Sequence, residues 1–142
     1  MKLKLILDYK SYISINDGTE KWGETFFNNI IKQESVIHFF SLMPRKGYLI
    51  ARISGEDLEL IIIGVDKANR RKGLAKEMLI KLFTLAKRKK LKKIFLEVSV
   101  KNKVAINLYK RVGFKTYQQR ENYYSKNRKK ETALLMLKDI II

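Results

Sequence analysis

The sequence predicts an α+β (α/β) fold built as one domain of residues 1–142. Three observations predict it. Apolar segments follow one another with short turns between them, which favours an antiparallel meander. A long amphipathic segment then separates two strand-like segments, which is the pattern of a βαβ unit. A short helical segment and a final pair of strands complete the chain.

The N-terminal elements differ in period. Residues 3–7, LKLIL, are expected to form a strand rather than part of a signal peptide, because no small-residue cleavage site follows. Segment 22–33, WGETFFNNIIKQ, places apolar residues at helical spacing and predicts a helix. Segments 35–43 and 47–54 are rich in β-branched and aromatic residues on either side of PRKG, so a hairpin is expected there.

The middle of the chain carries the clearest pattern. Segment 58–66, LELIIIGVD, is the most apolar strand. Between residues 73 and 90 apolar positions recur three and four apart while lysines fill the other face, which predicts an amphipathic helix. Segment 92–100, KKIFLEVSV, should then lie parallel to 58–66, because a helical crossover joins the two strands.

The C-terminal elements follow from their capping residues. Segment 102–114 is predicted to be a short helix, with Asn102 capping its start and Gly113 in the left-handed conformation at its end. Segments 114–119 and 132–140 are expected to be the last two strands.

Composition limits the classes of function. The absence of cysteine excludes disulfides and thiolate sites, and the single histidine, His38, cannot form a metal cluster, so no metal is expected. No apolar run approaches the roughly 20 residues of a membrane span, so no membrane partner is expected and a cytoplasmic location is favoured. The net charge of +17 fits a polyanionic partner such as nucleic acid, a ribosome or an acidic cofactor. The alternative is a plain solvated lysine surface.

A basic turn containing glycine precedes the long helix. The glycine turn, residues 70–75 with the sequence RRKGLA, joins strand 58–66 to that helix. A helix N-terminus offers unpaired N–H groups and partial positive charge, so an anion fits there. Gly73 lets the backbone approach the anion closely. A purely structural helix start is the alternative, and the missing GxxxxGK[ST] pattern gives nucleoside triphosphate hydrolysis no support.

The glycine turn and four motifs that follow it resemble one family. The glycine turn resembles the Q/R-x-x-G-x-G/A turn of the GCN5-related N-acetyltransferase (GNAT) superfamily, with Arg70, Gly73 and Ala75 in the pattern positions. LEV, an Asn, AINLYKRVGF and NYY follow in the order found in its RimI-like branch, which acetylates the N-terminal alanine of a ribosomal protein. The resemblance covers about residues 58 to 138.

The resemblance implies a mixed, mostly antiparallel sheet with a central splayed parallel strand pair and flanking helices. It also implies acetyl-CoA as co-substrate, with the pantetheine arm between the splayed strands and the pyrophosphate at the glycine turn. Gly64 is expected to leave room for that arm. The cofactor-binding residues implied are Ile63, Gly64, Val65, Arg71, Lys72, Gly73, Leu74, Ala75, Lys76 and Asn102.

The same resemblance implies the catalytic residues. Glu97 matches the general base and is expected to be desolvated within its apolar strand, and Tyr109 matches the general acid. Tyr123 and Tyr124 are expected to line the acceptor groove. The structural alternative for Glu97 is an exposed glutamate paired with a lysine, and for Tyr109 it is a core aromatic residue. For Tyr123 and Tyr124 it is ordinary packing on a strand surface.

The expected reaction is acetyl transfer to an amine, with the N-terminal alanine of a ribosomal protein as the expected acceptor and partner. One alternative is a GNAT enzyme that acts on lysine side chains or a small-molecule amine. Another, of a different class, is a basic ribosome- or RNA-binding module with a degenerate GNAT fold. Retention of Glu97, Tyr109 and the glycine turn favours the enzyme.

Overall fold

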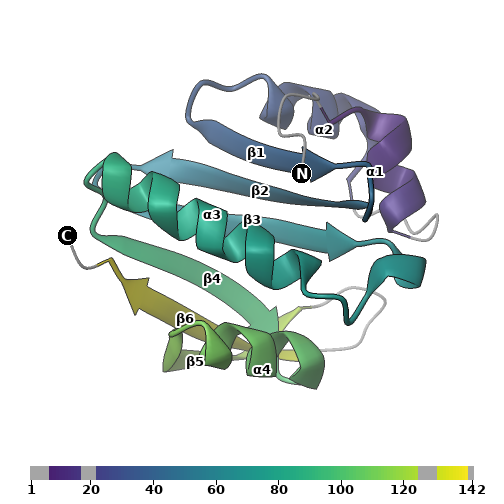
Figure 1. The fold of residues 1–142 in the computed structure, drawn as a ribbon. Helices are drawn as coiled ribbons and strands as arrows, with labels where there is room; N and C mark the ends of the chain where they lie inside the picture. The colour runs from purple at the N-terminus through teal and green to yellow at the C-terminus, as the bar shows by residue number, and fades with distance from the viewer. Residues whose placement is uncertain (1–6, 17–21, 125–130, 141–142) are drawn as a thin grey trace.

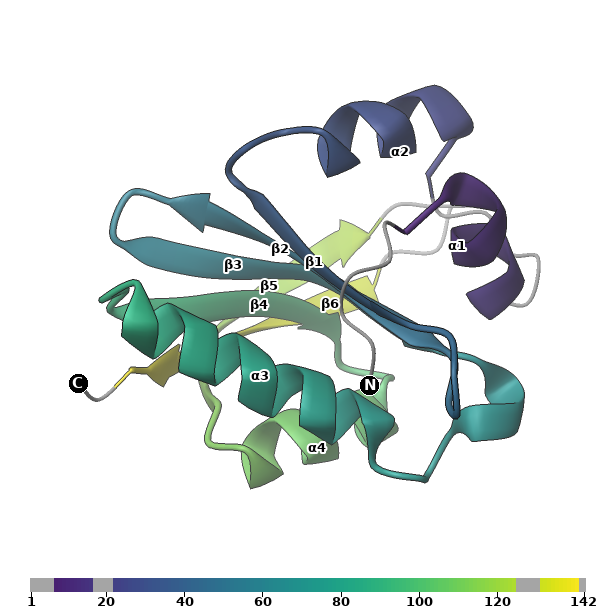
Figure 2. The ribbon, with the colours of Figure 1, turned by 45° about the horizontal axis from the view of Figure 1, so that its top comes forward.

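A computed structural model describes residues 7–16, 22–124 and 131–140. In these ranges a six-stranded sheet has the order β1-β2-β3-β4-β6-β5, with α1 and α2 on one face and α3 and α4 on the other (Figures 1 and 2). The elements are α1 (Tyr9–Ile15), α2 (Glu24–Ile31), β1 (Val36–Ser41), β2 (Gly47–Ser54), β3 (Asp57–Val65), the 3-10 helix η1 (Lys67–Asn69), α3 (Leu74–Arg88), β4 (Lys93–Ser99), α4 (Lys103–Arg111), β5 (Lys115–Tyr124) and β6 (Glu131–Asp139).

The predicted elements after residue 22 are all present. The strand expected at 3–7 lies outside the described residues, apart from Leu7. Helix α1 was not predicted, because seven residues are too few to establish a period. Asp8 caps α1 by accepting a hydrogen bond from the Ser11 N–H (2.7 Å).

The first three strands form the expected antiparallel meander, with one irregularity. Ile50 pairs with Ile62, whereas its neighbour Ala51 pairs with Leu60. Ile61 is therefore an extra residue in β3, which is the arrangement of a β-bulge. The bulge bends β3 at the point from which it leads toward the glycine turn.

Strands β3 and β4 are parallel, as predicted, but they pair over a short distance. Their register contains only Leu58 with Ile94 and Glu59 with Phe95. Beyond these pairs β3 continues to Val65 beside β2, and β4 continues to Ser99 beside β6. The two halves of the sheet therefore separate toward these ends, which confirms the splayed central pair.

Two apolar clusters hold the layers together. The larger cluster joins α3 and α4 to the sheet and includes Leu74, Met78 and Tyr109. The smaller cluster lies beneath α1 and α2 and includes Tyr12, Phe27 and Tyr48. Each face of the sheet thus has its own apolar cluster. Among the described residues, no helix has the length and apolar character needed to cross a membrane.

Candidate active site

The separated strands leave main-chain groups of β3 facing the gap. The Asp66 N–H donates to the Lys46 carbonyl oxygen (2.9 Å), and positions along an antiparallel pair alternate between hydrogen-bonded and non-hydrogen-bonded. The amide and carbonyl of Gly64 therefore point toward β2, whereas those of Ile63 and Val65 point toward β4. The Val65 carbonyl oxygen accepts a hydrogen bond from Nε of Arg70 (3.0 Å). Because β4 has diverged at this level, the groups of Ile63 and the Val65 N–H are placed to bind an extended molecule.

Gly64 has a different role from the one expected. A Cβ at this position would lie 2.6 Å from Cε1 of Tyr48, which is closer than real Cβ contacts. Gly64 therefore makes room for the buried Tyr48 ring on the face that α1 and α2 cover. It still lines the cleft through its backbone.

A cleft of about 930 Å³ lies at the end of the sheet where β3 and β4 have separated. Its walls come from the end of β3, the glycine turn, the start of α3 and one side of α4. The predicted residues that line it are Ile63, Gly64, Val65, Arg71, Gly73, Leu74, Ala75, Lys76, Asn102 and Tyr109. Lys72 and Glu97 are not among the lining residues.

The start of α3 has the geometry of an anion site. Gly73 is the N-cap residue with φ +82°, and Arg71 also has a positive φ of 64°. The first bond of the helix runs from the Glu77 N–H to the Gly73 carbonyl oxygen (3.0 Å). The amides of the three preceding residues therefore lack intrahelical acceptors. The cationic side chains in the cleft lining are Arg70, Arg71, Lys76 and Arg111.

Tyr109 projects from α4 into this cleft. Its side chain is 7% exposed, and its ring packs edge-on against Phe114 at a centroid distance of 5.7 Å. Burial raises the pKa of Tyr109 to about 12, so the phenol is protonated at neutral pH. Tyr109 is thus a core residue whose protonated phenol lies at the cleft wall.

Asn102 is the helix cap that the sequence predicted, and its contact with a cofactor stays a prediction. Its side-chain oxygen accepts a hydrogen bond from the Ala105 N–H (3.2 Å) and so caps α4. The same residue lines the cleft. Capping therefore holds the start of α4 at the cleft wall.

Glu97 lies on the other face of the sheet. Its neighbours Leu96 and Val98 join the core with Tyr109, so strand alternation turns Glu97 away from α4. The carboxylate is 36% exposed and accepts a hydrogen bond from Nη1 of Arg120 (3.3 Å). The desolvation expected for Glu97 is therefore absent. An exposed glutamate paired with a lysine was the structural alternative, and the partner in the structure is an arginine.

The two catalytic candidates consequently lie on opposite faces of β4 and its neighbours. A reacting group that both side chains approach would have to lie between β3 and β4, where their pairing has ended. Tyr123 and Tyr124 belong to β5, but their side chains lie outside the described part of the structure. Their expected role in an acceptor groove stays a prediction.

Several lining residues were missed by the sequence analysis. Val104, Asn107, Leu108 and Arg111 are separated from one another by three or four residues on α4, and this helical spacing was a usable signal. Ile15 and Asn16 come from α1 and its end, which was not recognised as a helix. Asn69, Arg70 and Ala105 complete the lining.

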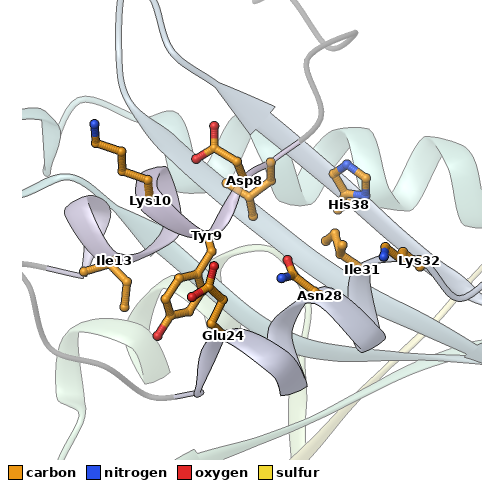
Figure 3. A pocket seen from close by; sticks show the side chains of 10 residues that line it. Asp8, Tyr9, Lys10, Ile13, Glu24, Asn28, Ile31, Lys32 and His38 are labelled. Carbon is orange, nitrogen blue, oxygen red and sulfur yellow. The ribbon is translucent and has the colours of Figure 1, made fainter.

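A second hollow of about 920 Å³ lies between α1, α2 and the edge strand β1 (Figure 3). His38 of β1 forms part of its wall, and burial lowers the pKa of this imidazole. This hollow shares no residue with the cleft and contains none of the predicted site residues. The other residues lining it are Leu7, Asp8, Tyr9, Lys10, Ile13, Glu24, Asn28, Ile31 and Lys32.

Comparisons with known proteins agree with this geometry. The [ribosomal protein bS18]-alanine N-acetyltransferase of Escherichia coli strain K12 is 30% identical over 118 residues, covering 81% of this chain and 78% of that protein. The crystal structure of the ribosomal-protein-S18-alanine N-acetyltransferase from Escherichia coli matches with a TM-score of 0.84 at 24% identity, over 97% of this chain and 93% of that one.

A Bacillus subtilis acetyltransferase in complex with CoA has the same fold, with a TM-score of 0.77 at 12% identity over 99% of this chain and 97% of that one. The model of the acetyltransferase (GNAT) family matches residues 7–114. The match spans the meander, the βαβ unit and helix α4, which together build the cleft. The chain therefore belongs to the acetyltransferase (GNAT) family.

Proposed function

We propose that this acetyltransferase moves the acetyl group of acetyl-CoA to the amine at the N-terminus of a protein, with the N-terminal alanine of a ribosomal protein as acceptor. The cleft is the observation that carries the proposal. It combines a helix N-terminus, strand backbone that β4 does not pair with and a protonated phenol in one place.

The binding of acetyl-CoA follows from the polarity of the cleft. The unpaired amides at the start of α3 and the surrounding cations suit the diphosphate. The backbone groups of Ile63 and Val65 suit the amides of the pantetheine arm, in the manner of an added strand. The acetyl thioester of the co-substrate then lies where β3 and β4 begin to separate.

The proposed chemistry places a proton acceptor on one face and a hydrogen-bond donor on the other. Glu97 accepts a proton from the acceptor amine, directly or through water, because its carboxylate is open to solvent. The amine nitrogen forms a bond to the acetyl carbon, and the bond from that carbon to sulfur breaks. The Tyr109 hydroxyl donates a hydrogen bond to the departing sulfur, which leaves as a thiolate. A backbone N–H of β3 near Val65 is the proposed donor to the carbonyl oxygen.

The nature of the acceptor is inferred from the relatives and from acidity. The Escherichia coli relative is named for the N-terminal alanine of ribosomal protein bS18. An α-amine has a pKa of ~7.7–8.0, against ~10.4 for lysine, so it needs little help to lose its proton at neutral pH. An exposed base such as Glu97 fits that modest requirement. The positive charge of the chain also disfavours polyamines.

Mass spectrometry of peptides tests the proposal. A peptide that begins with alanine and contains an internal lysine should gain one acetyl group at its N-terminus when incubated with enzyme and acetyl-CoA. The same peptide with a blocked N-terminus should gain none. Acetylation of the blocked peptide would favour a lysine acetyltransferase. CoA binding without transfer to either peptide would contradict the proposed acceptor.

One surface favours a second candidate function, RNA binding. Six of the seven residues from 87 to 93 are Lys or Arg, and they lie at the end of α3 that is opposite the glycine turn. Filter binding of ribosomal RNA fragments at increasing salt would measure it. Salt-sensitive RNA binding together with no binding of CoA would favour this candidate over the enzyme.

A further inference from the structure

The turn between β1 and β2 supports the glycine turn from below. The Lys46 N–H donates to Oδ1 of Asn69 (2.9 Å), and the Lys46 carbonyl oxygen accepts from the Asp66 N–H (2.9 Å). A Cβ on Gly47 would lie 2.7 Å from Cδ2 of Leu74, the first residue of α3. The β1–β2 turn, residues 44–47, is thus in direct contact with the segment that forms the anion site.

Arg45 makes the most specific of these contacts. Its Nη1 donates to the Lys72 carbonyl oxygen (2.6 Å), and its Nη2 pairs with Oε2 of Glu77. The Arg45 side chain is 25% exposed, so the guanidinium is partly removed from solvent. One planar group therefore joins the residue before Gly73 to the first turn of α3.

The contact with Lys72 fixes a peptide plane. In a trans peptide the carbonyl of one residue and the N–H of the next point in opposite directions. Because Arg45 holds the Lys72 carbonyl, it turns the Gly73 N–H away from the β1–β2 turn. Gly73 then adopts its positive φ and leads into the unpaired amides of α3. Arg45 thereby orients the backbone on which the proposed diphosphate site depends.

The contact with Glu77 is electrostatic. Glu77 is the acidic residue in the first turn of α3, beside the position proposed for the diphosphate. A carboxylate there repels an anionic ligand, and the Arg45 guanidinium offsets it. Lysine would preserve the charge but lacks the planar fork that reaches both partners.

We propose that Arg45 is a positioning residue for acetyl-CoA, which holds the Lys72–Gly73 peptide in its binding orientation and neutralises Glu77. The inference rests on the proposed function, because it assumes that the diphosphate occupies the start of α3. Arg45 does not line the cleft and acts through the residues that do. It should therefore affect the affinity for CoA and leave the chemical step intact.

Calorimetric titration with CoA and steady-state kinetics with acetyl-CoA test this role in the full chain. The variants are R45M, R45K, E77Q and the double variant R45M/E77Q. Arg52→Met is the matched control, because Arg52 forms an exposed pair with Glu59 (3.3 Å), and neither residue lines the cleft. Thermal unfolding of each variant reports any loss of stability.

For R45M we expect the Kd for CoA and the KM for acetyl-CoA to rise about tenfold, the effect of 1.4 kcal/mol, with kcat within about twofold. E77Q in the R45M background should recover about threefold of that affinity, and added salt should shrink this recovery. R45K should lie between R45M and the unaltered chain. R52M should bind CoA normally.

Normal CoA affinity in R45M would overturn the inference while leaving the proposed function in place. A fall in unfolding temperature and kcat with an unchanged KM would also overturn it, because that is a structural role. If E77Q in the R45M background does not recover affinity for CoA, Arg45 does not act by neutralising Glu77. If the unaltered chain gave no heat with CoA, the proposed function itself would fail, and this inference with it.

Discussion

Replacing Tyr109 with phenylalanine tests the proposed chemistry most directly. The substitution removes one hydroxyl and keeps the ring that packs against Phe114. At pH 7.5 and a pKa of about 12, about one Tyr109 side chain in 30,000 is ionised, so a donor is always present. Stability should change little, because the apolar contacts of the ring are retained.

The raised pKa also limits the size of the effect. The thiol that leaves resembles cysteine, with a pKa of ~8.5, so complete proton transfer from a phenol of pKa about 12 is unfavourable in isolation. Tyr109 should therefore act as a hydrogen-bond donor to sulfur while the carbon–sulfur bond breaks. A hydrogen bond to a charged acceptor contributes ~1.5–3 kcal/mol, which corresponds to about 10- to 150-fold in rate.

Steady-state assays that follow release of CoA, together with calorimetric titration of CoA, would measure this. We expect kcat of Y109F to fall by about 10- to 150-fold with the Kd for CoA within about twofold. Activity should also show no decline from Tyr109 ionisation below about pH 11, because the donor is lost only near its pKa of about 12. A kcat within twofold of the unaltered enzyme would refute the role, and an equal loss of affinity would show that the hydroxyl binds rather than donates.

Three further predictions concern the base, the glycine turn and His38. E97Q should lower kcat at pH 7 by about 10²-fold or more, and this deficit should narrow at pH 9, where an α-amine is neutral without help; a pH series of kcat checks this. G73A should lower the free energy of unfolding in urea by about 1–2 kcal/mol and raise the KM for acetyl-CoA, because Gly73 has a φ of +82° that alanine rarely adopts. Steric contact is not the cause, since the atom nearest to an added Cβ is Nη1 of Arg45 at 4.0 Å. Burial lowers the pKa of His38 in the folded chain. As the pH falls, the imidazole is therefore protonated in the unfolded chain before it is protonated in the folded chain, and the folded chain loses stability. Between pH 7.5 and 5 the unfolding temperature of H38Q should fall less than that of the unaltered chain.

The sequence predicted the glycine turn because its signals are local. A positive φ, an N-cap and flanking cations all occur within six residues, and the strand and helix periods on either side are long enough to read. Arg45 escaped the same reasoning. Its partners Lys72 and Glu77 are 27 and 32 positions away, and the connection exists only after β1, β2 and α3 have packed.

The exposure of Glu97 was misjudged for a different reason. The segment IFLEVSV was read as uniformly apolar, although its period of two already separates Ile94, Leu96 and Val98 from Glu97. The structure buries Ile94, Leu96 and Val98, whereas Glu97 is exposed on the other face of β4 beside Arg120. The missing information was which face of the sheet the helices leave uncovered, and this depends on the whole topology.

The gap that forms the site persists because neither half of the sheet needs the other. Strand β4 pairs with β6 along its length and β3 with β2, so each completes its main-chain bonds on one side. A buried N–H without a partner costs about 1–3 kcal/mol, so the groups left facing the gap must meet solvent or a ligand. The proposed recognition by backbone places few demands on side chains, which is consistent with Ala75 in the second small position of the turn. Differences between members of the family should then concentrate in the side chains near Glu97, where the acceptor is proposed to bind.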